Sequence, residues 1–129
     1  MAVMNADNYH DEQNKQNILK MRAVLDTLPP FCKTFFRGIE AYTSARTRLA
    51  YAYDIRLFFE YLHENNAVYA KMEIREFPLT MLDNLTRLDI EEYLEYMSLY
   101  QKEGKDISNA ERGKARKLAA LRSFYNYFF

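Results

Sequence analysis

The sequence predicts an all-α fold, and two observations favour this class. Only three glycines and three prolines occur among the 129 residues, too few for the frequent tight turns of a β-sandwich or β-barrel. Apolar residues make up 49% of the chain and recur at helical spacing, and the 16% aromatic content supplies enough apolar surface for a core. We therefore expect five helices.

The first two expected helices are separated by a pair of prolines. Helical spacing predicts the first over residues 11–28. Pro29 and Pro30 end it, because proline cannot continue a helix and disfavours helical geometry in the residue before it. A shorter second helix is expected over residues 31–42.

The third expected helix spans residues 45–64 and has signals at both ends. Thr43 and Ser44 offer side-chain oxygens as N-caps, and Asn65 with Asn66 indicates a stop. Four side chains at positions i, i+4, i+7 and i+11 predict the face that packs into the core: Tyr51, Ile55, Phe58 and Leu62.

The fourth expected helix follows a loop that contains Pro78. It begins at Thr86, with Asp89 three residues later as a variant of the capping box, and continues to Glu103. Gly104 then indicates its end, because glycine readily adopts the left-handed conformation that terminates helices.

The fifth expected helix begins at Ser108, with Glu111 completing a capping box, and runs to the end of the chain. Its expected core face consists of Leu118, Leu121, Tyr125 and Phe128. No stop signal follows, and the last residues are aromatic. We therefore expect a further domain after residue 129 in a parent protein, and a C-terminal aromatic segment through which two copies could associate.

Cysteine content and hydropathy favour a cytoplasmic protein. The single Cys32 cannot form an internal disulfide, and isolated thiols are typical of reducing compartments. No stretch approaches the ~18 apolar residues of a membrane span, and the N-terminal segment is polar rather than a signal peptide. We therefore expect no membrane partner.

Charge is segregated along the chain although the net charge is zero. Residues 33–56 carry five basic and two acidic side chains, and residues 109–129 carry five basic and one acidic. Residues 57–103, between them, carry ten acidic and four basic side chains. A folded molecule could therefore have one positive and one negative surface, although a single charge run is often only a solvated face.

The first turn of the third helix is a candidate phosphate site. Free backbone N–H groups, the positive end of the helix dipole, hydroxyls and guanidinium groups converge there. The side chains concerned are Ser44, Arg46, Thr47 and Arg48. The alternative is that Ser44 only caps the helix and the arginines only keep its first turn solvated.

The fifth helix has a second basic face, opposite its core face, made of Arg112, Arg116, Ala119 and Ser123. Arginines followed by small residues let a helix approach a groove closely while the guanidinium groups reach phosphates or a guanine edge. Lys114 and Lys117 flank this face. Alanine is also a good helix former, so the small residues alone indicate little.

Residue patterns typical of catalysis or metal binding are missing from the sequence. His10 and His63 lack a second ligand at metal spacing, and there is no glycine-rich phosphate loop. Tyr51, Tyr93 and Tyr125 lie at core spacing, which favours packing over a nucleophilic role. We therefore predict no catalytic residue, no metal site and no cofactor.

Three segments resemble the motifs of a known family, in the right order and spacing. Residues 47–58 (TRLAYAYDIRLF) are similar to T-x-x-x-Y-x-x-D-[LI]-x-x-F, and residues 116–127 (RKLAALRSFYNY) to R-x-L-[SA]-A-L-R-x-F-[YF]-x-[YF]. Residues 85–90 (LTRLDI) resemble the start of the helix between these motifs. These features resemble the N-terminal core-binding domain of tyrosine recombinases, the phage-integrase group, over residues 31–129.

The resemblance implies a four-helix, SAM-like orthogonal bundle over residues 29–129, with residues 1–28 as an N-terminal extension. In that family the second and fourth helices of the bundle face duplex DNA, and here these would begin at Ser44 and Ser108. A separate C-terminal domain carries the catalytic residues, including a His-x-x-Arg motif. This sequence contains no His-x-x-Arg, so the resemblance assigns it no catalytic residue and implies that the catalytic domain is absent.

We therefore predict a non-enzymatic, DNA-binding fragment of a recombinase, whose partners are duplex DNA and its own catalytic domain. The alternative is a helical protein-interaction module without a nucleic-acid role, in which Leu49, Tyr53, Leu57 and the aromatic C-terminus bind a partner. The predicted DNA contacts are Ser44, Arg46, Thr47, Arg48, Ser108, Asn109, Arg112, Lys114, Arg116, Lys117 and Ser123.

Overall fold

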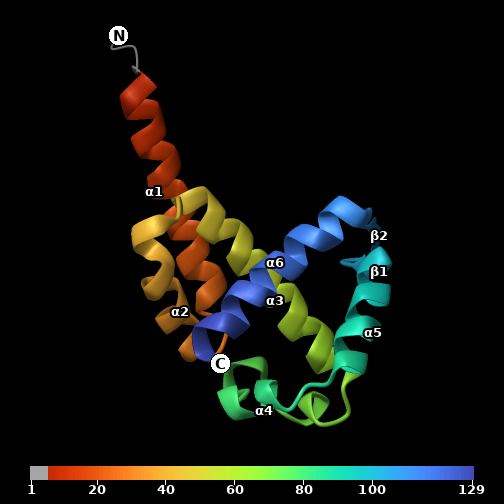
Figure 1. Ribbon diagram of the computed structural model, residues 1–129. Coiled ribbons are helices and arrows are strands. Elements are labelled where there is room, and N and C mark those ends of the chain that lie inside the picture. Colours follow the sequence, from red (N-terminus) through yellow and green to blue (C-terminus); the bar gives the residue numbers. More distant parts are fainter. Residues whose placement is uncertain (1–5) are drawn as a thin grey trace.

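The structure is a computed structural model that describes the backbone of residues 6–129 and the side chains of residues 8–80 and 82–129. Its elements, in chain order (Figure 1), are α1 (Ala6–Leu25), α2 (Phe31–Ile39), η1 (Glu40–Tyr42), α3 (Ala45–Asn65), η2 (Tyr69–Lys71), η3 (Ile74–Glu76), α4 (Leu79–Asp83), α5 (Arg87–Ser98), β1 (Leu99–Lys102), β2 (Lys105–Ser108) and α6 (Glu111–Phe128). The all-α class is confirmed, with one small two-stranded sheet in addition. The start of the predicted extension, residues 1–5, lies outside the described residues.

α3 forms the centre of the bundle, and both α1 and α6 pack directly against it (Figure 1). Its predicted core face is confirmed, because Ile55, Phe58 and Leu62 are buried and Tyr51 is half-buried. Aromatic rings fill much of the interior. The largest fully buried ones are Phe35, Phe58, Phe59, Phe77, Tyr93 and Phe124.

α6 buries a face slightly different from the predicted one. Leu121 is buried as expected, but Leu118, Tyr125 and Phe128 are only half-buried, and Phe124 is fully buried instead. The reason is that the Phe124 ring packs between α2 and α3, at 5.4 Å from the Phe35 ring and 6.1 Å from the Phe59 ring. The core face of α6 therefore turns toward Phe124.

A β-hairpin replaces the predicted end of the fourth helix. α5 begins as expected, with a capping box between Thr86 and Asp89, but it ends at Ser98 rather than at residue 103. β1 and β2 then pair antiparallel, with Lys102 opposite Lys105. Residues 103 and 104 both have positive φ, so they form a tight two-residue turn, in which the glycine starts a hairpin rather than ending a helix.

The predicted start of the fifth helix is two residues too early. Ser108 belongs to β2, and the N-cap of α6 is Ala110, which makes no side-chain cap. The expected capping box between Ser108 and Glu111 does not form, because pairing with β1 holds Ser108 in the strand. Asn109 joins the two elements, since its Nδ2 donates to the Met97 carbonyl at 3.0 Å.

α1 divides into a packed end and a projecting end. Val24, Leu25 and Leu28, at and just beyond its C-terminus, belong to the hydrophobic core. Residues 8–16 are exposed, and this part of the helix projects from the bundle (Figure 1). The end of the predicted extension is therefore packed on the bundle through the same core as the rest of the domain.

Candidate nucleic-acid interface

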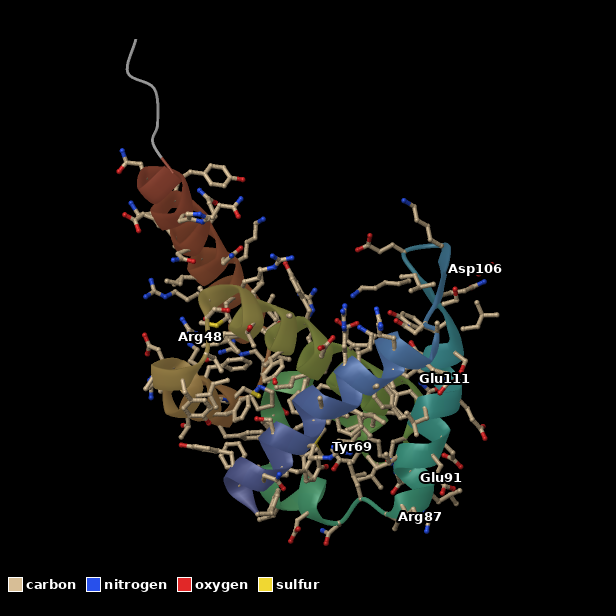
Figure 2. The ribbon with its side chains drawn as sticks, turned by 45° about the horizontal axis from the view of Figure 1, so that its top comes forward. Arg48, Tyr69, Arg87, Glu91, Asp106 and Glu111 are labelled. Carbon is tan, nitrogen blue, oxygen red and sulfur yellow. The ribbon has the colours of Figure 1, made fainter. Side chains whose placement is uncertain are left out.

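The two helices that carry the predicted contacts cross each other. Lys117 of α6 meets Asp54 of α3 at 3.0 Å, and both side chains are largely buried. In both views, the N-terminal halves of α3 and α6 diverge from this crossing toward the same side of the molecule (Figures 1 and 2). The N-terminal halves of these two helices therefore lie on one side of the domain (Figures 1 and 2).

Lys117 is bound within the protein at the contact between α3 and α6, so it is not a free cation. Its ammonium donates to the Asp54 carboxylate. Burial raises the pKa of Asp54 above its usual value, while the hydrogen bond and charge of Lys117 act in the opposite direction. Lys117 therefore offsets part of the cost of burying Asp54 at the contact between α3 and α6.

The first turn of α3 begins as the sequence predicts. Ser44 is the N-cap, and its Oγ accepts a hydrogen bond from the Thr47 backbone N–H at 3.1 Å. The Ser44 hydroxyl also lies 2.9 Å from the Thr47 hydroxyl, to which it donates. The two hydroxyls are therefore engaged with each other, while the Arg46 side chain is exposed.

Arg48 corrects the prediction for this turn, because it is only 7% exposed. Its guanidinium donates to the Thr43 carbonyl at 2.5 Å, to the Glu40 carbonyl at 3.2 Å and to the Thr43 hydroxyl at 3.2 Å. It lies where α1, α2 and the start of α3 meet (Figure 2). The Glu40 and Thr43 carbonyls follow the end of α2, and they bind the Arg48 guanidinium inside the protein. Arg48 is therefore not one of the exposed cations.

The N-terminal half of α6 keeps its arginines exposed. Arg112, Arg116 and Ala119 are exposed, and Ser123 is half-buried on the same helix. Among the side chains that the structure describes, no carboxylate forms a salt bridge with Arg46, Arg112 or Arg116. We call these three residues the arginine face.

Of the remaining predicted contacts, Lys114 and Asn109 are engaged within the protein, whereas the Ser108 side chain is not. Lys114 forms a salt bridge with Glu111 at 2.8 Å and donates to the Ser98 hydroxyl at 3.2 Å. Ser108 is exposed on β2, and Asn109 is half-buried through its bond to α5. Lys114 and Asn109 therefore connect the start of α6 to the end of α5.

Some cations elsewhere on the domain are paired with carboxylates. Arg87 bonds Glu91 on α5, at the end of the domain away from the crossing (Figure 2), and Lys102 reaches Glu60. Arg56 also pairs with Glu60 and lies 5.2 Å from the centre of the Tyr53 ring. Lys71, Arg75 and Lys105 are also exposed and form no salt bridge among the described side chains, so the arginine face is distinguished by its place on the two crossed helices.

The apolar surface required by the alternative function is smaller than expected. Leu57 is only 5% exposed and Leu49 is half-buried, which leaves Tyr53 as the exposed residue of the three. At the C-terminus, Phe128 packs on Phe31 with 5.8 Å between ring centres. The exposed large side chains there are Tyr127 and Phe129.

The tyrosines that lie at core spacing in the sequence pack as this spacing predicts. Tyr93 is fully buried against Phe58, and the Tyr125 hydroxyl donates to the Leu82 carbonyl at 2.9 Å. Burial raises the pKa of both phenols, which opposes formation of a nucleophilic phenolate.

Among the described residues, none of the helices is long and apolar enough to cross a membrane. The same part of the chain has no cluster of three or more histidine, cysteine, aspartate or glutamate residues arranged to hold a metal ion.

Comparison with known proteins shows that the chain contains a tyrosine recombinase-related domain. The relative is the tyrosine recombinase XerC of Caldanaerobacter subterraneus subsp. tengcongensis, which is 30% identical over 110 residues. The match covers 78% of this chain but 29% of the relative, so the chain spans less than a third of that protein's length. No protein-family profile matches the chain. No solved structure matches it either.

Proposed function

We propose that this chain is the core-binding domain of a site-specific tyrosine recombinase, which grips duplex DNA at a recombination half-site mainly through phosphates. In this proposal residues 29–129 form the binding domain and residues 1–28 an extension. Catalysis is supplied by a separate C-terminal domain of the parent protein, and this chain alone cleaves no DNA. The relationship to a tyrosine recombinase supports the class of the parent protein.

The observation that carries the proposal is the arginine face. Arg112 and Arg116 are exposed, free of carboxylate partners among the described residues, and followed on α6 by the small residues Ala119 and Ser123. A helix with small side chains can approach a groove closely, while arginines reach phosphate oxygens or the edge of a guanine. Arg46, on α3, extends the positive charge to the second helix.

The structure narrows the set of residues that we propose to contact DNA. Lys114, Lys117 and Arg48 support the surface, because their charged groups already bind protein acceptors. Ser44 and Thr47 hold the first turn of α3. The arginine face and Ser123 remain as direct contacts. Tyr127 and Phe129, exposed at the end of α6, are a small surface for self-association or for the catalytic domain.

A salt titration with a matched control tests this function. Duplex DNA binding is measured by fluorescence anisotropy at two or more salt concentrations for the parent, for Arg112→Ala with Arg116→Ala, and for Arg75→Ala with Arg87→Ala. The first pair should weaken binding about 10- to 100-fold at low salt and reduce the salt slope by about 2, because each phosphate contact contributes ~0.9 to that slope. The control pair removes the same charge from exposed positions outside the two crossed helices.

The control pair should bind within about twofold of the parent, because screening weakens distant surface charges. If Arg112→Ala with Arg116→Ala binds as tightly as the parent, α6 is not the DNA-binding helix. Gel filtration with and without DNA addresses the alternative function. A protein-interaction module would self-associate and ignore the DNA.

A further inference from the structure

A shallow hollow lies on the C-terminal half of α6, next to Tyr42. Its volume is about 430 Å³. It is lined by Tyr42, Ala119, Arg122, Ser123, Asn126 and Tyr127. Tyr42 comes from η1 and the other five from α6, so the hollow spans two segments that are distant in the sequence.

The lining is rich in hydrogen-bond donors. It offers a guanidinium, an amide N–H₂, a serine hydroxyl and two phenol hydroxyls, and no carboxylate lines it. Within the described side chains, Arg122 and Asn126 make no hydrogen bond or salt bridge, and the hydroxyls of Tyr42, Ser123 and Tyr127 donate to no protein acceptor. Several unused donors and one positive charge around a small space suit a phosphate group.

One wall of the hollow is held in place by packing. The Tyr127 ring contacts Phe35 and Phe128 edge-on, with 5.6 Å and 4.9 Å between ring centres. Its outer edge lies over Gly38 of α2, where an added Cβ would overlap the ring. Gly38 therefore makes room for this tyrosine, which gives the hollow a defined side.

The hollow also continues the surface assigned to DNA. Ala119 and Ser123 line it, and both belong to the stripe of α6 that begins with Arg112 and Arg116. Tyr42, which is 73% exposed, stands on its other side, two residues before the Ser44 cap of α3. A DNA strand that follows the stripe along α6 would thus reach the hollow.

We propose that this hollow binds a backbone phosphate of the DNA, with Arg122 and Asn126 as its main donors and Tyr42 as a further one. The inference rests on the proposed function and extends its contact set to residues that sequence reasoning did not select. Arg122 provides charge and two parallel N–H donors, and a tyrosine hydroxyl donates one hydrogen bond without carrying charge.

Three variants test the hollow by DNA titration at several salt concentrations: Arg122→Ala, Asn126→Ala and Tyr42→Phe. Arg122→Ala should weaken binding roughly 3- to 10-fold at low salt and lower the salt slope by about 0.9, as expected for one lost phosphate contact. Asn126→Ala and Tyr42→Phe should weaken binding less and leave the slope nearly unchanged, because they remove donors without removing charge. Thermal unfolding of each variant confirms that it is folded.

The controls separate this inference from the proposed function. Arg87→Ala removes one charge from α5 and should bind like the parent. If Arg122→Ala binds like the parent while Arg112→Ala with Arg116→Ala does not, the hollow does not bind DNA and the proposed function stands. If no version of the chain binds DNA, both fail together.

A second experiment uses inorganic phosphate as the probe. NMR follows the Arg122 Nε–H signal and the side-chain amide signals of Asn126. Shifts of these signals on adding duplex DNA, with no saturable shift on adding phosphate, support a site for the DNA backbone. Saturable phosphate binding without a response to DNA would overturn the proposal, because the hollow would then be a site for the free ion.

Discussion

The first turn of α3 and the N-terminal half of α6 both contribute arginines, yet they use them differently. In α3, Arg48 is buried against carbonyls at the end of the preceding helix, and only Arg46 remains exposed. In α6, both Arg112 and Arg116 remain exposed. The difference arises from what precedes each helix: the Glu40 and Thr43 carbonyls lie next to the start of α3 and accept from Arg48, whereas a closed hairpin precedes α6.

The first turn of α3 is therefore mainly a structural joint, whereas α6 carries more of the free charge. Two arginines separated by one residue can therefore have opposite roles. Variants of each helix should then separate effects on stability from effects on DNA binding.

Arg48→Ala should produce the largest effect of these variants. It leaves the Glu40 and Thr43 carbonyls and the Thr43 hydroxyl without their shared donor, in a partly buried setting. We expect a loss of about 2–3 kcal/mol in the free energy of unfolding, measured with urea. Arg46→Ala, the matched control, should change it by less than about 0.5 kcal/mol. Equal stabilities for the two variants would contradict the structural role of Arg48.

Lys117→Met tests the ion pair at the crossing of α3 and α6. Because Lys117 lowers the pKa of Asp54, its removal should raise that pKa further, which NMR titration of the carboxyl group would detect. Unfolding should also become easier at neutral pH by about 1–2 kcal/mol, since a half-buried carboxylate loses its partner.

The sign of the pH dependence follows from the raised pKa of Asp54. A carboxyl group that binds its proton more tightly in the folded state favours folding most when it is protonated. Its contribution to stability therefore falls as pH rises through the interval between the unfolded and folded pKa values. Lys117→Met should raise the folded-state pKa of Asp54 and so extend this pH interval upward. Asp54→Asn removes the titrating group and should abolish this pH dependence. A downward shift of the pKa in Lys117→Met would show that the pair does not form.

The helix caps should give the smallest effects. Ser44→Ala removes the bond to the Thr47 N–H and should cost about 1 kcal/mol, whereas α6 has no side-chain cap at Ala110. Ala110→Ser should accordingly stabilise the domain by about 0.5 kcal/mol in the same urea experiment. A loss of stability in Ala110→Ser would mean that the hairpin, rather than the missing cap, determines how α6 begins.

Sequence reasoning was most successful where the physical cause is local. The Ser44 cap, the box formed by Thr86 and Asp89, and the buried face of α3 depend on side chains within one or a few turns. Helical spacing and cap chemistry therefore predicted these features directly. The all-α class followed from the same signals.

The features that were missed depend on partners remote in the sequence or on a choice between two uses of one residue. Gly104 can end a helix or close a two-residue turn, and strand pairing of Tyr100 with Ile107 decided for the turn. Lys117 meets Asp54 across 63 residues, a pairing that periodicity cannot reveal. Arg122 lay within a recognised motif, but only the approach of Tyr42 makes the hollow visible. The DNA contacts themselves stay a prediction.

The ion pair between Asp54 and Lys117 also limits how far the domain could change shape to fit a curved or a straight DNA duplex. Tilting α6 relative to α3 would pull apart two opposite charges that are largely shielded from water. Such motion is costly, so in the proposed complex with DNA the two helices should dock as one rigid body. The deformation needed for a close fit would then fall on the nucleic acid, and sequences that bend easily would be favoured even at positions that no side chain touches.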